Sequence, residues 1–333
     1  MEYTRLGASN LVVSKICLGT MHFGSKTTES DAFAIMDTAL EMGINFFDTA
    51  NVYGGRPSTG RTEEIMGNWF NQGGGRREQV VLASKVYGQM VVDPPPNEAS
   101  GVSAYKVRKH LEDSLRRLQI DHLDLYQVHH IDRTITLEEF WGTFGRLVDR
   151  GDTLYVGTSN FPGWGLAKYQ MYARQHGRLG FVSEQTQYNL LNRIPELEVL
   201  PAAEDMGIGV LAYMPLGGGL LTGKKTLVEG SRTQSVEREY EITPDRKPQF
   251  DAFSELCQEI GEPEYIVAIA WVLSHPAVSS AIVGVRTLEH LKGLDRAASL
   301  QLDTEVIDRL ERIFDINKGR PLGPGPAPEA YAW

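Results

Sequence analysis

The chain has 333 residues, a length that fits either one closed α/β barrel or about two smaller domains. Apolar residues make up 41% of it and charged residues 23%, a balance typical of globular proteins that excludes disordered, collagen-like and low-complexity chains. Lys and Arg together number 33 against 43 Asp and Glu, giving a net charge of -10, so we expect no nucleic-acid partner.

The cysteines and the N-terminus predict a cytoplasmic protein. Cys17 and Cys257 form neither a CxxC nor a Cys/His metal spacing, so we expect two reduced core residues and no metal site. The charged start of the chain leads to no apolar segment, and we therefore predict no signal peptide. The longest apolar run, residues 265–273, is far shorter than the roughly 20 residues of a membrane helix. We expect a buried helix there and no membrane partner, while the oligomeric state stays open.

The first predicted element is a hairpin, formed by Leu6, the turn residues 7–10 and a short strand at 11–13. After it, short apolar segments alternate with amphipathic helical ones. One helical face ends before Gly43, which suits the position after a helix, and another begins after Ser103, a suitable N-cap. The apolar segments show little alternation, as strands buried on both faces should, and lie at residues 15–19, 45–49, 80–85, 123–128, 154–158, 181–185, 209–213 and 280–284.

Eight β-α alternations favour closure into a (β/α)8 TIM barrel, an α/β fold. The alternative, an open doubly wound sheet, needs a GxGxxG turn after the first strand, but residues 19–24 read GTMHFG and no P-loop occurs. We predict a single barrel domain over residues 1–333, with a Pro-rich tail at about 318–333 along its surface. The long connection at 216–247 is expected to be functional, acting as a lid over a cofactor.

The carboxyl ends of barrel strands carry the functional residues, and there the second, third and fourth strands place Asp48, Tyr53, Lys85 and His129. Asp48 and Lys85 must pair, because an isolated buried charge is costly. The ammonium would lower the pKa of Tyr53 from about 10 toward neutrality. Tyr53 could then donate a proton to a carbonyl oxygen that His129 orients. Proton transfer alone reduces nothing, so a hydride source is needed, and nicotinamide is the simplest one.

Over residues 3–314 the sequence resembles the aldo-keto reductases, and most closely their bacterial and potassium-channel β-subunit side. The stretches that carry the resemblance are Gly19-Thr20-Met21, Asp48-Thr49-Ala50 with Tyr53-Gly54, Asp124-Leu125-Tyr126-Gln127-Val128-His129, Gly157-Thr158-Ser159-Asn160-Phe161, Gln185 with Tyr188-Asn189-Leu190, and Pro215-Leu216-Gly217 followed by Thr222-Gly223-Lys224. The family fold is a (β/α)8 barrel with an N-terminal hairpin plug and extra C-terminal helices.

The resemblance implies that Tyr53 is the general acid, Lys85 its activator, Asp48 the partner of the lysine and His129 the residue that orients the carbonyl. It implies NADPH rather than NADH, since Arg286 supplies a fixed cation for the 2′-phosphate. The implied cofactor residues are Thr20, Asp48, Ser159, Asn160, Gln185, Tyr213, Leu216, Gly217, Gly218, Lys224, Arg232, Gly284, Arg286 and His290. Those expected to line the substrate pocket are His22, Phe23, Tyr87, Met90 and His130.

The implied reaction is reduction of an aldehyde or ketone to an alcohol, with a small-molecule carbonyl compound as substrate. The Pro-rich ending is similar to that of bacterial members that reduce keto-sugars in natural-product metabolism. Two alternatives stay open: a cofactor-binding barrel that senses redox state or joins a channel with negligible turnover, and a barrel isomerase or lyase without hydride chemistry. The other histidines are expected at the surface or in the packing: His110, His122, His176 and His275.

Overall fold

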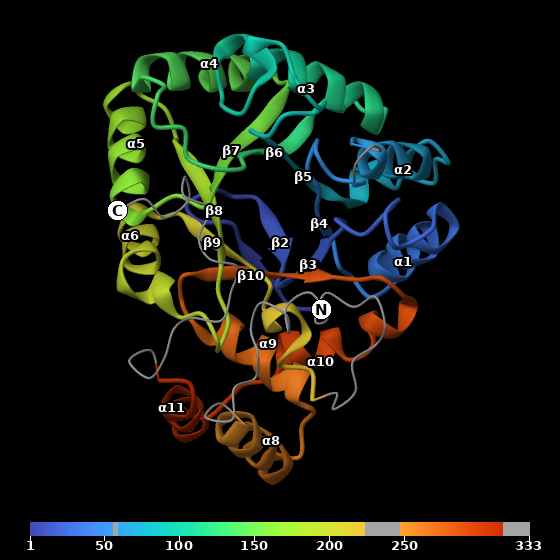
Figure 1. The fold of residues 1–333 in the computed structure, drawn as a ribbon, viewed down its shortest axis with the longest axis vertical. Coiled ribbons are helices and arrows are strands. Elements are labelled where there is room, and N and C mark those ends of the chain that lie inside the picture. The colour runs from blue at the N-terminus through green and yellow to red at the C-terminus, as the bar shows by residue number, and fades with distance from the viewer. Residues whose placement is uncertain (56–58, 224–246, 316–333) are drawn as a thin grey trace.

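A computed structural model describes residues 1–55, 59–223 and 247–315 (Figure 1). Within these residues eight parallel strands close into a barrel, in the order β10-β3-β4-β5-β6-β7-β8-β9. The strands are β3 (Ile16–Gly19), β4 (Phe46–Asp48), β5 (Val81–Val86), β6 (Leu123–Val128), β7 (Thr153–Ser159), β8 (Phe181–Gln187), β9 (Gly209–Tyr213) and β10 (Val278–Gly284). Each overlaps a segment predicted as a strand, which confirms the (β/α)8 barrel.

The predicted N-terminal hairpin is also confirmed, with β1 (Tyr3–Arg5) antiparallel to β2 (Val12–Ser14). Its turn packs against the amino ends of β8 and β9, where the Ala8 amide donates to the Gly207 carbonyl at 2.7 Å. Gly7 has a φ of +54°, and a Cβ there would lie 2.5 Å from the Val182 carbonyl oxygen, so only glycine fits. The hairpin therefore closes one end of the barrel and leaves the carboxyl ends of the strands open.

The helices that alternate with the strands surround the barrel (Figure 1). The ends of two of them confirm the predicted caps: Gly43 follows the first helix with a φ of +81°, and the Ser103 hydroxyl accepts from the Lys106 amide at 3.3 Å. These helices are α1 (Glu29–Glu41), α2 (Arg61–Phe70), α3 (Ala104–Leu118), α4 (Leu137–Arg150), α5 (Gly163–Gln175), α6 (Val199–Met206), α9 (Glu264–Ser274) and α10 (Leu294–Ser299).

Two further helices, α8 (Lys247–Ile260) and α11 (Thr304–Ile313), pack on one another outside this ring (Figure 1). The Phe253 and Phe314 rings make that contact, with centroids 5.5 Å apart. The short 3-10 helices are η1 (Arg77–Gln79), η2 (Pro96–Glu98), η3 (Ile194–Leu197), η4 (Gly217–Gly219) and η5 (Leu288–Leu291). Most of the predicted lid segment and the Pro-rich tail lie outside the described residues. None of the described helices is both long and apolar enough to cross a membrane.

The apolar core has two parts, one between barrel and helices and a smaller one inside the barrel. The inner part joins Leu6 and Val13 of the hairpin segment to inward residues of the strands, such as Phe46 and Leu125. Above this apolar layer, toward the carboxyl ends of the strands, the barrel interior becomes polar. The site is built on that polar layer.

Candidate active site

The centre of the site is an ion pair between adjacent strands. Asp48 ends β4 level with Ala83 of β5, and Lys85 follows two residues later on the same inward face, because side chains alternate along a strand. The Lys85 ammonium is fully buried and donates to the Asp48 carboxylate and, at 2.9 Å, to the Thr49 carbonyl. The structure therefore joins the two charges that the sequence analysis expected to pair.

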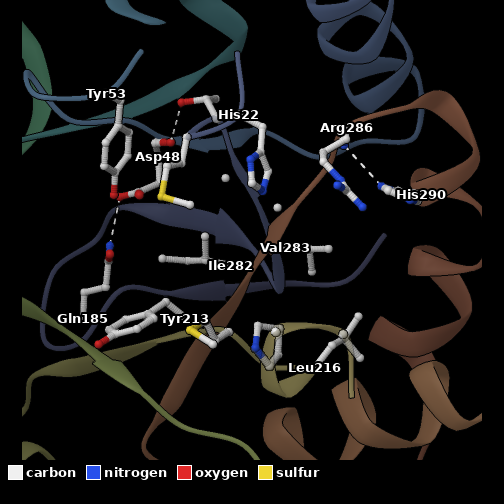
Figure 2. Close-up of a pocket in the computed structure, with 18 of the residues that line it drawn as sticks. His22, Asp48, Tyr53, Gln185, Tyr213, Leu216, Ile282, Val283, Arg286 and His290 are labelled. Carbon is white, nitrogen blue, oxygen red and sulfur yellow. Dashed lines mark hydrogen bonds between the residues drawn. The ribbon is translucent and has the colours of Figure 1, made fainter. Parts of the chain in front are cut away.

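Two amides complete the surroundings of Asp48. Its second carboxylate oxygen accepts from the Gln127 amide at 3.0 Å. The same oxygen accepts from the Gln185 amide at 2.9 Å (Figure 2). The sequence analysis gave Gln127 no role in the site, although it lies near the end of β6, two residues before His129, which directly follows the strand. Asp48 is thus a fixed acceptor, held by donors from three other strands, β5, β6 and β8.

Lys85 remains an ammonium in this setting. Burial alone would lower its pKa, but the charges of Asp48 and Tyr53 and the hydrogen bonds with both groups raise it above its ordinary value of 10.5. The ammonium nitrogen lies 5.1 Å from the centroid of the Tyr53 ring. A permanent positive charge therefore stands beside the phenol, where it stabilises the phenolate that is left once the proton has gone.

His129 faces the same phenol but is uncharged. Its ring meets Tyr53 edge-on, with centroids 5.9 Å apart, and stacks on His130 at 5.2 Å. Burial, followed by the positive charges of Lys85 and His130, lowers the pKa of His129 well below its ordinary 6.5. A neutral imidazole at pH 7 can donate a hydrogen bond to a substrate oxygen, but it does not compete with Tyr53 as the acid.

Tyr53 and His129 open into a cavity of about 570 Å³ above the barrel. Figure 2 shows Tyr53, Asp48, Gln185 and Tyr213 toward one end of this cavity and Arg286 with His290 toward the other. The predicted site residues that line it are Thr20, His22, Asp48, Tyr53, His129, His130, Ser159, Asn160, Gln185, Tyr213, Leu216, Gly218, Gly284, Arg286 and His290. Residues from widely separated parts of the chain thus meet in one place.

Amide and hydroxyl side chains form a hydrogen-bond network at the end of the cavity near Tyr53. Asn160 has a φ of +58°, a left-handed conformation that asparagine tolerates better than most residues. Its side-chain N–H groups donate to the His129 carbonyl and to the Ser159 hydroxyl, both at 3.0 Å, and its oxygen accepts from the Tyr213 hydroxyl at 3.0 Å. The Ser159 hydroxyl donates in turn to the Gln185 carbonyl at 2.8 Å. These side chains are fixed before any ligand arrives.

The opposite end of the cavity carries positive charge. Arg286 follows β10, and its backbone amide donates to the His290 Nδ1 at 3.2 Å (Figure 2). His22, expected in the substrate pocket, lies between the two ends and close to Gly284, where a Cβ would lie 3.7 Å from the imidazole. Glu289 also lines this end, paired with Lys292 at 2.6 Å. His22 therefore lines the middle of the cavity, between the Tyr53 end and the Arg286 end (Figure 2).

Some predicted residues lie elsewhere. Lys85 is covered by the residues that line the cavity, and Gly217 is buried, with Leu191 where a Cβ would point. Phe23 is fully buried in the outer core, so it cannot contact a substrate. Tyr87 and Met90 do not line the cavity, although Tyr87 packs edge-on against His130 at 5.2 Å. Lys224 and Arg232 lie outside the described residues.

Cavity residues that the sequence analysis overlooked include Met214, Thr222, Tyr265, Ile282 and Val283. Ile282 and Val283 precede Gly284 on β10, so the strand-end rule alone could have found them. Tyr265 lies at the start of α9, and no local pattern distinguishes it from a core residue. The overlooked residues are mainly apolar, as expected for the walls of a small-molecule site.

Comparison with known proteins agrees with this geometry. The model of the aldo/keto reductase family matches residues 15–315. The chain is 50% identical to the uncharacterized oxidoreductase YrpG of Bacillus subtilis (strain 168), over 100% of both chains. It is 33% identical to the protein tas of Escherichia coli (strain K12), over 95% of this chain and 98% of that protein. A probable voltage-gated potassium channel subunit beta of Oryza sativa subsp. japonica is 32% identical over 96% and 98%. The chain therefore belongs to the aldo/keto reductase family.

Proposed function

We propose that this oxidoreductase reduces an aldehyde or ketone to an alcohol with NADPH, and that Tyr53 is the general acid. The observation that carries the proposal is the buried Asp48–Lys85 pair beside the Tyr53 phenol and the neutral His129, at one end of a cavity. A purely structural ion pair would not need a phenol and an imidazole that converge on the same open space.

The hydrogen-bond acceptors at the end of the cavity near Tyr53 suit a nicotinamide carboxamide. Both N–H groups of Asn160 are already donated, and those of Gln185 go to Asp48 and Gln127. What these two side chains can still offer a ligand is a carbonyl oxygen, and such oxygens accept from an amide NH2 group. Tyr213, fixed by Asn160, would stack on the nicotinamide ring. Ser159, Asn160 and Gln185 are thus proposed to hold the carboxamide.

The arginine end of the cavity suits a phosphate. The Arg286 guanidinium can bind two oxygens of a phosphate dianion at once. His290 and Gly284 line the same end, and the Glu289 carboxylate there is offset by Lys292. This charge pattern supports NADPH over NADH, because only NADPH carries the 2′-phosphate. Thr20, Leu216 and Gly218 also line the cavity, and we propose that they border the ribose and pyrophosphate.

The nicotinamide, when bound, supplies the hydride that the protein side chains cannot provide. Tyr53 donates its proton to the oxygen that becomes the alcohol, and the Lys85 ammonium stabilises the resulting phenolate. His129 donates a hydrogen bond to the same oxygen and so fixes its position. Asp48 keeps Lys85 charged and aimed at Tyr53. In the reverse direction the same groups remove the proton of an alcohol.

We propose a small carbonyl compound as the substrate, with a keto-sugar as one candidate. His130 lines the cavity next to His129 and would contact the substrate, while Tyr87 packs behind His130. The similarity to a probable potassium channel subunit beta supports a second candidate, a barrel that binds the cofactor with negligible turnover. The complete set of proton-transfer groups favours the reductase.

The test is NADPH oxidation at 340 nm with a panel of aldehydes, ketones and keto-sugars, with the alcohol product identified by mass spectrometry. We expect turnover with at least one class, a lower kcat/KM with NADH, and loss of turnover in the Tyr53→Phe variant. Tight NADPH binding without turnover on any member of the panel would favour the cofactor-binding candidate. Failure to bind either dinucleotide would contradict both.

A further inference from the structure

A buried hydrogen-bond chain ties the Tyr53 loop to helix α3. The Asn51 side-chain amide lies 2.9 Å from Nδ1 of His110, and Nε2 of the same ring lies 2.8 Å from the Glu98 carboxylate. Asn51 is fully buried and His110 is 2% exposed. From the sequence, His110 was expected only at the surface or in the packing. Here it is the middle member of a polar chain behind the active site.

The hydrogen-bond partners of His110 determine which of its ring nitrogens carries the hydrogen. A carboxylate only accepts, so Nε2 of His110 carries the hydrogen given to Glu98. Burial lowers the pKa of His110, while the Glu98 hydrogen bond raises it and the charges of Lys106 and Lys109 lower it again, leaving it below 6.5. In the neutral ring Nδ1 is an acceptor, so Asn51 must donate through its NH2 group. The chain therefore runs from Asn51 through His110 to Glu98.

Asn51 is a central residue of the turn that delivers Tyr53. The Tyr53 amide donates to the Ala50 carbonyl at 3.0 Å, which makes Asn51 and Val52 the two middle residues of the turn. The backbone amide of Asn51 also donates to the backbone carbonyl of Lys85 at 3.3 Å. The backbone of this turn is thus tied to β5, and its side chain is tied to α3.

Helix α3 also holds the segment that follows Lys85. The buried Lys106 ammonium donates to the carbonyls of Tyr87 and Ala99. The loop after β4 and the loop after β5 are therefore both attached to one face of α3, by His110 and by Lys106. A displacement of that face would alter the position of the Tyr53 phenol relative to the Lys85 ammonium.

We propose that His110 is a positioning residue for Tyr53, acting through Asn51 and held in its tautomer by Glu98. The proposal rests on the proposed reductase function for its effect on rate, but its structural part does not. A misplacement of about 1 Å can slow an enzyme by roughly 10²-fold. His110 lies outside the cavity, so its removal should leave the cofactor contacts intact.

The first experiment compares His110→Leu, which cannot bind Asn51 or Glu98, with His110→Gln, which keeps an acceptor and a donor. For His110→Leu we expect kcat per NADPH-binding site to fall by about 10²-fold, with the NADPH Kd within about twofold of wild type. His110→Gln should recover most of the rate. Asn51→Ala breaks the same bond from the other side and should match His110→Leu. His176→Leu, at the exposed residue that follows α5, is the control for losing a histidine.

Combining variants separates positioning from general damage. In a Tyr53→Phe background, His110→Leu should lower the residual single-turnover rate no further, because the residue it positions is already absent. An equal fall in the single-turnover rate in both backgrounds would overturn the proposal. It would also be overturned if His110→Leu lowered only the Tm and the fraction of active enzyme. A large rise in NADPH Kd with unchanged kcat would also overturn it.

Hydrogen exchange tests the structural part even if no carbonyl substrate is reduced. In His110→Leu and Asn51→Ala, the amides of residues 50–53 should exchange about tenfold faster than in wild type, with α5 and β7 unchanged. Unchanged exchange in this turn would overturn the proposal. Absence of turnover in wild type, with faster exchange in the variants, would contradict the reductase function alone.

Discussion

The buried carboxyl of Glu184 allows a quantitative prediction of how the stability of the fold depends on pH. It lies fully buried on β8, where its carboxyl accepts from the Thr158 hydroxyl at 2.5 Å and from the Phe161 amide at 3.1 Å. Neither partner carries a positive charge. Burial raises the pKa of Glu184 from 4.5 to about 8, because these hydrogen bonds offset only part of the desolvation. Glu184 is therefore protonated in the folded protein at neutral pH.

The size of the effect follows from that pKa. In the unfolded chain Glu184 loses its proton near its ordinary pKa of 4.5, whereas the folded protein keeps it until about pH 8. Because the folded-state pKa is the raised one, the stability that the proton contributes is complete below about pH 4.5 and is lost as the pH rises to about 8. At about 1.36 kcal/mol per pH unit, the loss amounts to at most about 5 kcal/mol.

The assay is urea unfolding of wild type and Glu184→Gln between pH 4.5 and 9. Glutamine is neutral throughout, so the variant should gain stability relative to wild type as the pH rises, with the difference levelling off above about pH 8. Glu204→Gln, at an exposed site on α6, should show no such trend. Parallel stability curves for wild type and Glu184→Gln would refute the reasoning and mean that the buried carboxyl is ionised.

Three further predictions concern the charged groups of the site. Lys85→Met removes the charge that stabilises the Tyr53 phenolate, so kcat should fall by at least about 10²-fold. The pH–rate profile should also lose its limb near neutrality. An unchanged pH–rate profile would contradict this role of Lys85. Asp48→Asn leaves the buried ammonium unpaired and should lower the free energy of unfolding by about 3–5 kcal/mol in urea, with part of the loss recovered when Lys85→Met is added. Arg286→Ala should weaken NADPH binding by about 10- to 150-fold in fluorescence titrations and leave NADH nearly unaffected. Equal weakening of both cofactors would instead assign Arg286 to the fold or the adenine pocket.

The sequence predicted most of the barrel because the information is local. Strand β6 matches the predicted residues 123–128, and every other strand overlaps its prediction, since strands buried on both faces are short apolar runs between turns. Asp48, Lys85 and His129 follow from one rule, that polar residues at the carboxyl ends of barrel strands face the site. The position of the candidate active site could therefore be predicted from the sequence.

What the sequence did not predict depends on long-range contacts. His110 looks like an ordinary helix residue until its partner Asn51, 59 positions away, is placed beside it. Phe23 follows a cavity residue directly, but the Phe23 amide donates to the Thr20 carbonyl in a tight turn and its own carbonyl accepts from the Thr62 hydroxyl, and the ring is buried in the outer core. Which way a turn residue points depends on the neighbouring elements, so spacing alone could not decide it.

The most direct test of the central claim follows the hydride and the proton together. With a carbonyl substrate found in the panel, single-turnover reactions would use NADPH carrying deuterium at both C4 positions, with wild type and with Tyr53→Phe. We predict deuterium at the alcohol carbon of the product, and a rate in the variant that is about 10²- to 10⁴-fold lower, at an NADPH Kd within about twofold of wild type. An alcohol without deuterium, or a Tyr53→Phe variant as fast as wild type, would contradict the proposed reaction.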